Sequence, residues 1–257
     1  MKTKNPTKAA TEFHNLIGWT NPTDFTLEEM SYSLGVIIKE LPIKGSEGRI
    51  LIKGDTGIIS LNSSITHPGK KNYIIAHELG HFILHKNITP LFLDTNKTLA
   101  EWYKNGVHEQ QANEFASELL MPSQLFKDKV AGKKLNTDMI KEIAAYFNVS
   151  MTAAFLKYRH LGSFPVMIIF IEDSFIKWKQ ASNDFPFSFL AIDSKVPAWT
   201  VAGDFFDGKG LEANPVKVDA VEWFPQDFQI KYKQNWKLWE QCFKVSENGL
   251  ISCLWAY

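Results

Sequence analysis

The chain has 257 residues, a length that suits one large domain or a domain with a smaller companion. Its 28 Lys and Arg residues balance its 28 Asp and Glu residues, which argues against a nucleic-acid or anionic-membrane surface as the main binding face of the chain. Hydrophobic residues make up 45% of the sequence and charged residues 22%, so the composition excludes a disordered chain.

The first residues carry lysines with no apolar stretch behind them, so we expect no secretory signal and a cytoplasmic location. No run approaches the roughly eighteen apolar residues that a membrane span requires, and no membrane role is expected. Residues 25–38 show helical spacing of apolar positions. Residues 49–53 and 57–62 are β-rich and are separated by a glycine-containing turn, which predicts a hairpin.

Two helices are predicted next, over residues 71–87 and about 109–120. The second ends before Pro122, because proline disfavours helix in the residue that precedes it. Two further helices, joined at residues 148–150, are expected over residues 137–162 and resemble a helix-turn-helix superficially. The last of these helices offers DNA only three basic or imidazole groups, those of Lys157, Arg159 and His160. Phosphate binding usually needs more, so we interpret the two helices as a packing pair.

The pattern changes after about residue 162, where six of the eight tryptophans lie and short β-rich segments follow one another. We therefore predict one domain over residues 1–162 and a smaller, mixed but β-rich accessory domain over residues 163–257. In the second domain, Cys242 and Cys253 flank an Asn-Gly dipeptide that favours a two-residue hairpin loop. Such a loop would place both thiols on one face of the hairpin, and we predict them to be free and buried in a reducing compartment.

The predicted helix of residues 71–87 contains the sequence His77-Glu78-Leu79-Gly80-His81. Four helical residues turn about 400°, so the two imidazoles project about 40° apart and can hold one metal ion. Zinc bound by two such nitrogens needs one more protein ligand and an open position for water, whose proton Glu78 is placed to accept. The alternative is a buried helix with hydrogen-bonded histidines, but burying these polar groups among apolar neighbours without a metal would be costly.

Several residues are candidates for the third ligand: His85, His108, Glu109, Glu114 and Glu118. His85 lies about 12 Å further along a continuous helix and would reach the ion only if the helix broke. A metzincin site is excluded, because its turn glycine and third histidine are missing at the required spacing. We favour Glu109, since the helix that it begins has small residues, such as Ala112 and Ala116, for close approach to the metal helix. Glu114 and Glu118 are more simply solvated helix charges, and His108 is incidental.

Three other residues are expected to support the site or to contact substrate: His85, Asn113 and Asn62. Asn62 ends the strand of residues 57–62, which comes directly before the metal helix. An edge strand at this place would pair with an extended substrate backbone. An ordinary sheet strand without this role is the alternative.

Three segments resemble the ImmA/IrrE family of zinc metallopeptidases in order and spacing: IISLN through YIIAHELGHFILH, HEQQANEFASELLMP, and IAAYFNVSMTAAFLKYRHLG. The resemblance spans roughly residues 45–162. It implies a gluzincin-like site with His77, His81 and Glu109 as zinc ligands and Glu78 as the base. It also implies a regulatory substrate, because characterised members cleave helix-turn-helix repressors and so switch on mobile-element or stress genes. The chain departs from many members in having no room for a helix-turn-helix domain before residue 25.

These features together predict an α+β fold, with a zincin-like metallopeptidase domain followed by the β-rich accessory domain. The predicted function is intracellular, zinc-dependent cleavage of a protein substrate, which the resemblance implies is a helix-turn-helix repressor. Direct binding of nucleic acid is not expected, and the oligomeric state is open. The competing hypothesis is a non-proteolytic antirepressor or binding module whose metal site is structural and therefore closed by a fourth protein ligand.

Overall fold

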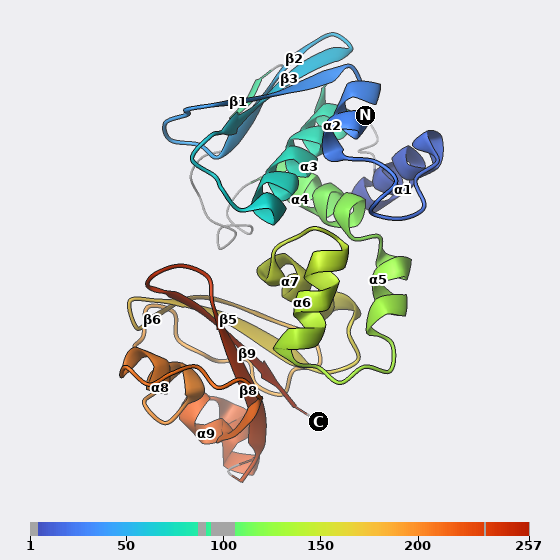
Figure 1. The fold of residues 1–257 in the computed structure, drawn as a ribbon. Coiled ribbons are helices and arrows are strands. Elements are labelled where there is room, and N and C mark those ends of the chain that lie inside the picture. Colours follow the sequence, from blue (N-terminus) through green and yellow to red (C-terminus); the bar gives the residue numbers. More distant parts are fainter. Residues whose placement is uncertain (1–4, 87–90, 94–105, 234, 257) are drawn as a thin grey trace. The chain divides into compact units, whose positions relative to one another are not determined.

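The computed structural model describes residues 5–86, 91–93, 106–233 and 235–256, with only the backbone described at 91–93. The chain forms two compact units (Figure 1). The N-terminal unit contains Met1–Phe126 and Ala144–Ser150, and the C-terminal unit contains Lys127–Ile143 and Met151–Tyr257. Each unit combines helices with a sheet, which confirms the predicted α+β class. Within the described ranges, no helix is long and apolar enough to cross a membrane.

The N-terminal unit has a four-stranded sheet with the strand order β1-β3-β2-β4. Strand β3 runs parallel to β1 and antiparallel to β2, and β2 is antiparallel to β4. The strands are β1 (Val36–Leu41), β2 (Gly48–Lys53), β3 (Thr56–Asn62) and β4 (Leu91–Leu93). The helices that lie wholly in this unit are α1 (Pro6–Ile17), α2 (Leu27–Ser33), α3 (Pro68–His85) and α4 (Val107–Leu120).

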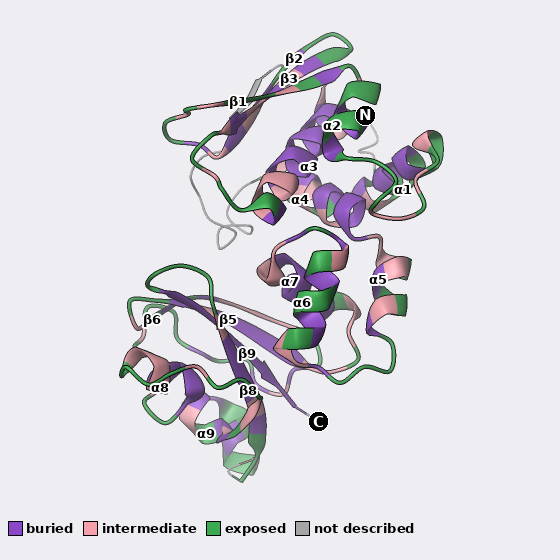
Figure 2. Cartoon of the chain, viewed as in Figure 1, coloured by how far each residue is buried: buried purple, intermediate pink, exposed green. Residues whose placement is uncertain are grey.

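Burial alternates strictly along β2 and β3, which shows that one face of this sheet packs against the core (Figure 2). The inward side chains of Ile50, Ile52, Ile59 and Leu61 are at most 5% exposed. Helix α3 packs on β2 and β3, so the sheet supports the helix that carries the metal motif. This arrangement follows from the period-2 pattern of the two β-rich runs.

Two predictions for this unit are corrected by the structure. The helix expected over residues 25–38 ends at Ser33, because Gly35 has a φ of +75° and the β-branched residues after it form β1. The strand predicted at the sheet edge, residues 57–62, is β3 and has hydrogen-bonded neighbours on both sides. It has no edge to offer a substrate, and among the described strands β1 and β4 form the edges of this sheet.

The C-terminal unit contains an antiparallel five-stranded sheet with the order β6-β5-β9-β8-β7. The central strand β9 is buried along its whole length, because helix α7 packs near β5 and β6 while α8 and α9 pack near β7, β8 and β9. The strands are β5 (Val166–Glu172), β6 (Phe175–Ala181), β7 (Val216–Asp219), β8 (Lys237–Lys244) and β9 (Gly249–Trp255). The helices are α7 (Met151–Leu161), α8 (Val201–Phe206), α9 (Ala220–Trp223) and the 3-10 helix η2 (Phe228–Tyr232).

The cysteine hairpin differs from the prediction in its register. Cys242 pairs with Ser252, and Cys253 pairs with Gln241, because the connection between β8 and β9 is longer than two residues. Adjacent residues of a strand point to opposite faces, so the two thiols lie on opposite faces of the sheet. Both are free and buried, as predicted.

The helices after residue 120 connect the two units. Helices α5 (Ser123–Val130) and α6 (Thr137–Tyr146) each run from one unit into the other. Helix α7, which the sequence likened to a DNA-recognition helix, buries Lys157 to 8% exposure, and its Arg159 hydrogen-bonds Gln180. Residues 151–162 belong to the C-terminal unit, whereas the sequence analysis assigned them to the first domain. The boundary at residue 162 stays a prediction.

Candidate metal centre

Helix α3 carries His77, Glu78 and His81 in the middle of its 18 residues. Every residue from Ile74 to Phe82 is buried there, and Glu78 is 0% exposed. The helix begins at Pro68, whose missing N–H suits a first helical position. The motif therefore lies in the apolar, well-packed part of the helix, where charged groups need partners.

Helix α4 brings Glu109 to the motif because α3 and α4 pack closely. A Cβ atom added at Gly80 would lie 3.0 Å from Cα and 3.1 Å from the carbonyl oxygen of Ala112. Such distances leave no room for a larger side chain at Gly80 without moving α4. The small residues expected to allow this approach, Ala112 and Ala116, are both 0% exposed.

The ligand atoms of His77, His81 and Glu109 converge within 4.8 Å of one another. The two Nε2 atoms lie 3.0 Å apart, and the carboxylate oxygens of Glu109 lie 3.2 Å from His77 Nε2 and 3.3 Å from His81 Nε2. Zinc bonds of about 2.0–2.1 Å in a tetrahedron separate neighbouring ligand atoms by about 3.3 Å. The spacing of these three atoms therefore fits one zinc ion.

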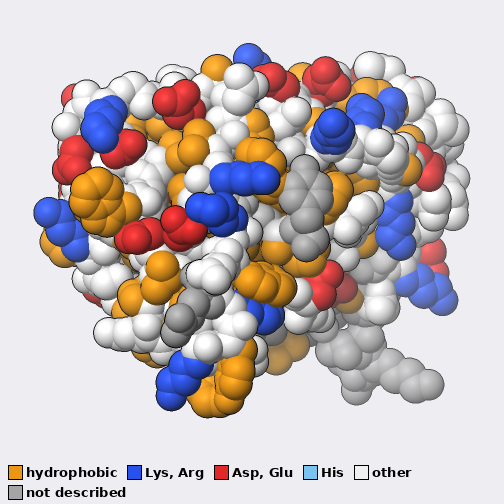
Figure 3. Space-filling model, turned by 90° about the horizontal axis from the view of Figure 1, so that it is seen from below, with side chains coloured by type: hydrophobic (Ala, Val, Ile, Leu, Met, Phe, Trp, Pro, Cys, Tyr) orange, Lys and Arg blue, Asp and Glu red, His pale blue; other side chains and the backbone are white. Residues whose placement is uncertain are grey.

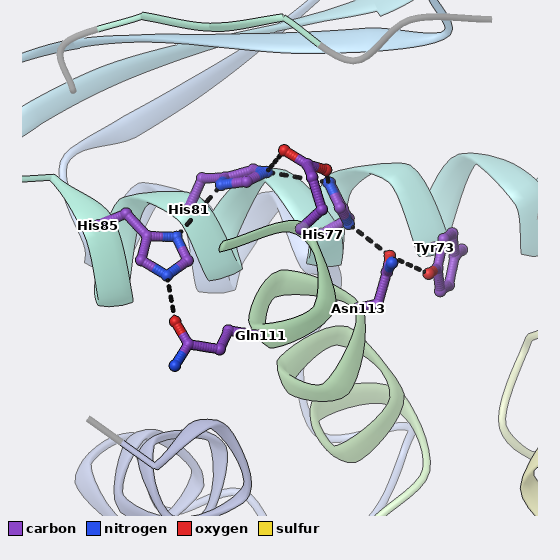
Figure 4. Close-up of polar contacts among 7 residues, drawn as sticks. Tyr73, His77, His81, His85, Gln111 and Asn113 are labelled. Atoms are coloured by element: carbon purple, nitrogen blue, oxygen red, sulfur yellow. Dashed lines mark hydrogen bonds and ion pairs between the residues drawn. The ribbon is translucent and has the colours of Figure 1, made fainter. Parts of the chain in front are cut away.

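Outer hydrogen bonds show that both Nε2 atoms present lone pairs to the centre (Figure 4). The amide oxygen of Asn113 accepts from Tyr73 Oη at 2.5 Å and lies 2.8 Å from His77 Nδ1, which must therefore carry the proton of that ring. On the other side, His85 Nε2 donates to Gln111 Oε1 at 2.9 Å, which leaves His85 Nδ1 to accept from His81 Nδ1 at 3.3 Å. Neutral rings protonated at Nδ1 have bare Nε2 atoms.

The charge states support the same conclusion. Burial lowers the pKa of His81 to about 4, although the neighbouring Glu109 carboxylate raises it, so His81 is neutral at pH 7. Two imidazole nitrogens and one carboxylate suit a divalent cation, and this donor set is typical of zinc.

Glu78 lies on the sheet side of α3. A Cβ atom added at Gly48, the first residue of β2, would lie 2.3 Å from Ile74 Cγ2 and 3.3 Å from Glu78 Oε1. The strand thus passes directly over the carboxylate, and a larger residue at Gly48 would displace it. Glu78 follows His77 on the same helix, and its carboxyl group is held out of bulk water.

The other predicted residues lie in different surroundings. Asn62 Nδ2 donates to the carbonyl oxygens of Ile43 and Ser46 at 2.8 and 3.1 Å, so this side chain holds the loop between β1 and β2. His108 packs its ring against that of His85, with 4.6 Å between the centroids. A substrate contact by Asn62 stays a prediction.

The expectation for Glu118 is corrected by the structure. This residue is 7% exposed and accepts hydrogen bonds from Ser123 N at 2.9 Å and Ser123 Oγ at 2.6 Å, so it caps the start of α5 and is not a solvated charge. Glu114 is exposed, as expected. Three residues around the centre were missed by the sequence analysis: Tyr73, Gln111 and Gly48. The one available signal was the glycine directly before the β-rich run that begins at Arg49.

Comparisons with known proteins agree with this geometry. The family model described as IrrE N-terminal-like domain (Peptidase_M78) matches residues 32–158. Metallopeptidase ImmA of Bacillus subtilis (strain 168) is 32% identical over 111 residues, which are 43% of this chain and 60% of that protein. A solved Mycobacterium tuberculosis transcriptional regulator shares the fold, with a TM-score of 0.57 and 14% identity over 98% of this chain and 87% of the other. Residues 32–158 of this chain therefore belong to the ImmA/IrrE family of metallopeptidases.

Proposed function

We propose that this protein is a zinc-dependent endopeptidase in which His77, His81 and Glu109 hold the metal and Glu78 is the general base. The observation that carries the proposal is the convergence of two bare imidazole nitrogens and one carboxylate at distances of 3.0 to 3.3 Å. The part of the chain that the structure describes supplies three ligands to the centre. A tetrahedral ion with three protein ligands keeps one position for water, as in catalytic sites.

When bound, zinc would lower the pKa of the attacking water and polarise the scissile carbonyl. Glu78 would take the proton from the water as the water oxygen bonds to the carbonyl carbon, and would transfer it to the nitrogen of the leaving amine as the C–N bond breaks. Glu78 directly follows the ligand His77 on α3, and this place in the motif supports its assignment as the base. Its complete burial favours proton transfer over exchange with bulk water.

The free edge of β4 supports cleavage of an extended chain. Among the described strands, β4 pairs with β2 alone, and the backbone of a substrate would pair along its other edge. Strand β4 pairs with Arg49 of β2. The residue before Arg49 is Gly48, which lies close to Glu78. This edge takes the role that the sequence had assigned to residues 57–62.

The substrate that we propose is a regulatory protein, with a helix-turn-helix repressor as the first candidate. The family match supports this choice, because the resemblance that the sequence carries is to peptidases of repressors. The C-terminal unit, outside most of the matched range, would select this partner before cleavage. Charges of both signs are interspersed on the face shown in Figure 3, which suits docking of a protein better than binding of a phosphate backbone.

The test compares wild type with Glu78→Gln, which keeps the size of the side chain but cannot accept the proton. Each protein, loaded with zinc, is incubated with casein and with the repressor encoded nearest to its gene, and fragments are mapped by mass spectrometry. We expect wild type to cut the repressor at few sites and Glu78→Gln to bind zinc equally but to cut nothing. Cleavage by Glu78→Gln would refute its role as base, and cleavage of neither protein by wild type would favour the non-proteolytic antirepressor.

A further inference from the structure

The two histidines of the centre differ in what holds them. His77 Nδ1 donates directly to an amide oxygen, that of Asn113, at 2.8 Å. His81 Nδ1 instead donates to a third imidazole, His85 Nδ1, at 3.3 Å, and His85 Nε2 donates in turn to Gln111 Oε1 at 2.9 Å (Figure 4). The first arrangement needs one acceptor, whereas the second is a chain of two hydrogen bonds.

An imidazole differs from an amide oxygen as an acceptor, because either of its nitrogens can carry the proton. His85 accepts from His81 only in the tautomer that is protonated at Nε2. In the other tautomer, His85 Nδ1 would donate to His81, whose proton would then move to Nε2 and block the metal-binding lone pair. The oxygen of Gln111 selects the first tautomer, because it can only accept a hydrogen bond.

The fold holds the members of this chain in place. His81 and His85 lie one helical turn apart on α3 and are 1% and 2% exposed. Gln111 lies on α4, two residues after Glu109, so the helix that delivers the carboxylate ligand also delivers the acceptor. The closeness of α3 and α4 at Gly80 and Ala112 therefore positions both together.

We propose that His85 and Gln111 act as a relay pair that fixes the tautomer and the ring orientation of His81 for zinc binding. The inference rests on the proposed zinc site. Neither residue touches the metal, so each is a positioning residue. Gln111 acts only through His85, and the effects of removing the two should therefore not add.

The experiment measures zinc affinity of the full chain at pH 7 by competition with a chelating dye. His85→Phe keeps a ring but removes both nitrogens, and Gln111→Met keeps the length of the side chain but removes the acceptor. We expect affinity to fall about 10–100-fold for His85→Phe, as for other outer partners of metal ligands, and by a smaller factor for Gln111→Met. The double variant should bind zinc as weakly as His85→Phe alone.

Two further variants separate a relay from a packing role. His85→Gln supplies an amide oxygen that accepts from His81, so it should recover part of the lost affinity. His108→Phe changes a ring that packs on His85 at 4.6 Å and should leave affinity unchanged. The visible absorption spectrum of the cobalt-substituted protein should shift for His85→Phe and return toward that of wild type for His85→Gln, because it reports the ligand field without any substrate.

The outcomes distinguish this inference from the proposed function. Wild-type affinity in folded His85→Phe, or additive losses in the double variant, would overturn the relay while leaving zinc binding and proteolysis intact. Should His85→Phe not fold, a wild-type affinity in Gln111→Met together with an unshifted cobalt spectrum would overturn it equally. Absence of zinc binding by wild type would overturn both the site and the relay.

Discussion

Two glutamates, one in each unit, have opposite surroundings. Glu240 of β8 is 0% exposed and accepts hydrogen bonds from five donors: Val201 N, Ala202 N, Trp223 Nε1, Ser252 Oγ and Cys242 Sγ. Two of these donors are the first backbone amides of α8, so Glu240 caps that helix from another element. Glu109 of α4 instead faces two imidazole nitrogens that carry no proton.

The groups around a carboxylate distinguish a structural role from a metal-binding one. Around Glu240 every near group brings a hydrogen, and the hydrogen bonds replace those lost with water. Around Glu109 the near groups bring lone pairs, which repel the carboxylate unless a cation lies between them. The histidines repeat the contrast, since buried His14 donates through Nε2 to Leu119 O at 3.0 Å, whereas His81 presents a bare Nε2.

We expect the greatest change in zinc affinity from a substitution of Glu109. Glu109→Gln removes the charge and should lower zinc affinity by more than the roughly 100-fold that loss of an outer partner can cost. Competition with a chelator at pH 7 measures it. Glu240→Gln makes the same chemical change in the other unit and should leave affinity unchanged, so an equal loss in both variants would contradict the assignment.

A substitution of Glu240 is expected to lower the stability of the protein. Glu240→Gln replaces an oxygen by an NH2 group and leaves at least two buried donors without an acceptor, at about 1–3 kcal/mol each. We expect the free energy of unfolding to fall by at least about 2 kcal/mol. Urea unfolding of the metal-free protein, followed by tryptophan fluorescence, measures it, and an unchanged midpoint would show that the cluster contributes little.

A smaller loss of zinc affinity is expected when Glu109 is moved but not substituted. Gly80→Ala places a Cβ 3.0 Å from Ala112 Cα, so α4 must shift by a few tenths of an ångström. We expect a loss of about 1–2 kcal/mol in stability, as in other overpacked contacts, together with weaker zinc binding. Gly106→Ala is the matched control, because a Cβ at Gly106 meets none of the described residues within 4 Å. Equal zinc affinity in both variants would mean that the approach of α4 is not limiting.

The smallest effect is a pH dependence at His14. Burial lowers the pKa of His14 below 6.5, although the hydrogen bond to Leu119 and the charge of Glu118 raise it in part. At this residue the unfolded chain therefore binds more protons near pH 6, and stability should decrease as pH falls below about 6.5, with a contribution from His14 of at most about 1.4 kcal/mol per pH unit. Urea unfolding at several pH values measures this slope. His14→Gln should flatten it, and an unchanged slope would assign it to other groups.

The sequence predicts the metal helix and the start of α4 because both depend on local rules. The spacing of His77 and His81 needs only a helix, and Glu109 follows from the small residues that allow two helices to meet. The outer hydrogen bonds were only partly predictable. Gln111 and Tyr73 have no motif of their own, and their roles depend on the angle at which α4 crosses α3.

The errors arise where a contact is distant in sequence or where one residue changes the register. The apolar run after Gly35 continues the helical pattern, and its change to β1 depends on pairing with β3. Glu118 points away from Glu109 on α4, which suggested solvent, but the turn at Pro122 brings Ser123 back onto its carboxylate. The cysteine register depends on the length of one loop, which the Asn-Gly dipeptide does not determine.

The interleaving of the two units affects how the chain folds during synthesis. The N-terminal unit uses residues 144–150, and the segment made just before them, residues 127–143, belongs to the C-terminal unit. During synthesis, the N-terminal unit cannot complete its contacts until residue 150 has left the ribosome. Residues 127–143 cannot pack in the C-terminal unit until its sheet has been synthesised. A chain that stops near residue 162 would contain the whole N-terminal unit and the proposed metal ligands. It would also expose the buried face of α7, whose contacts with β5 and β6 it lacks.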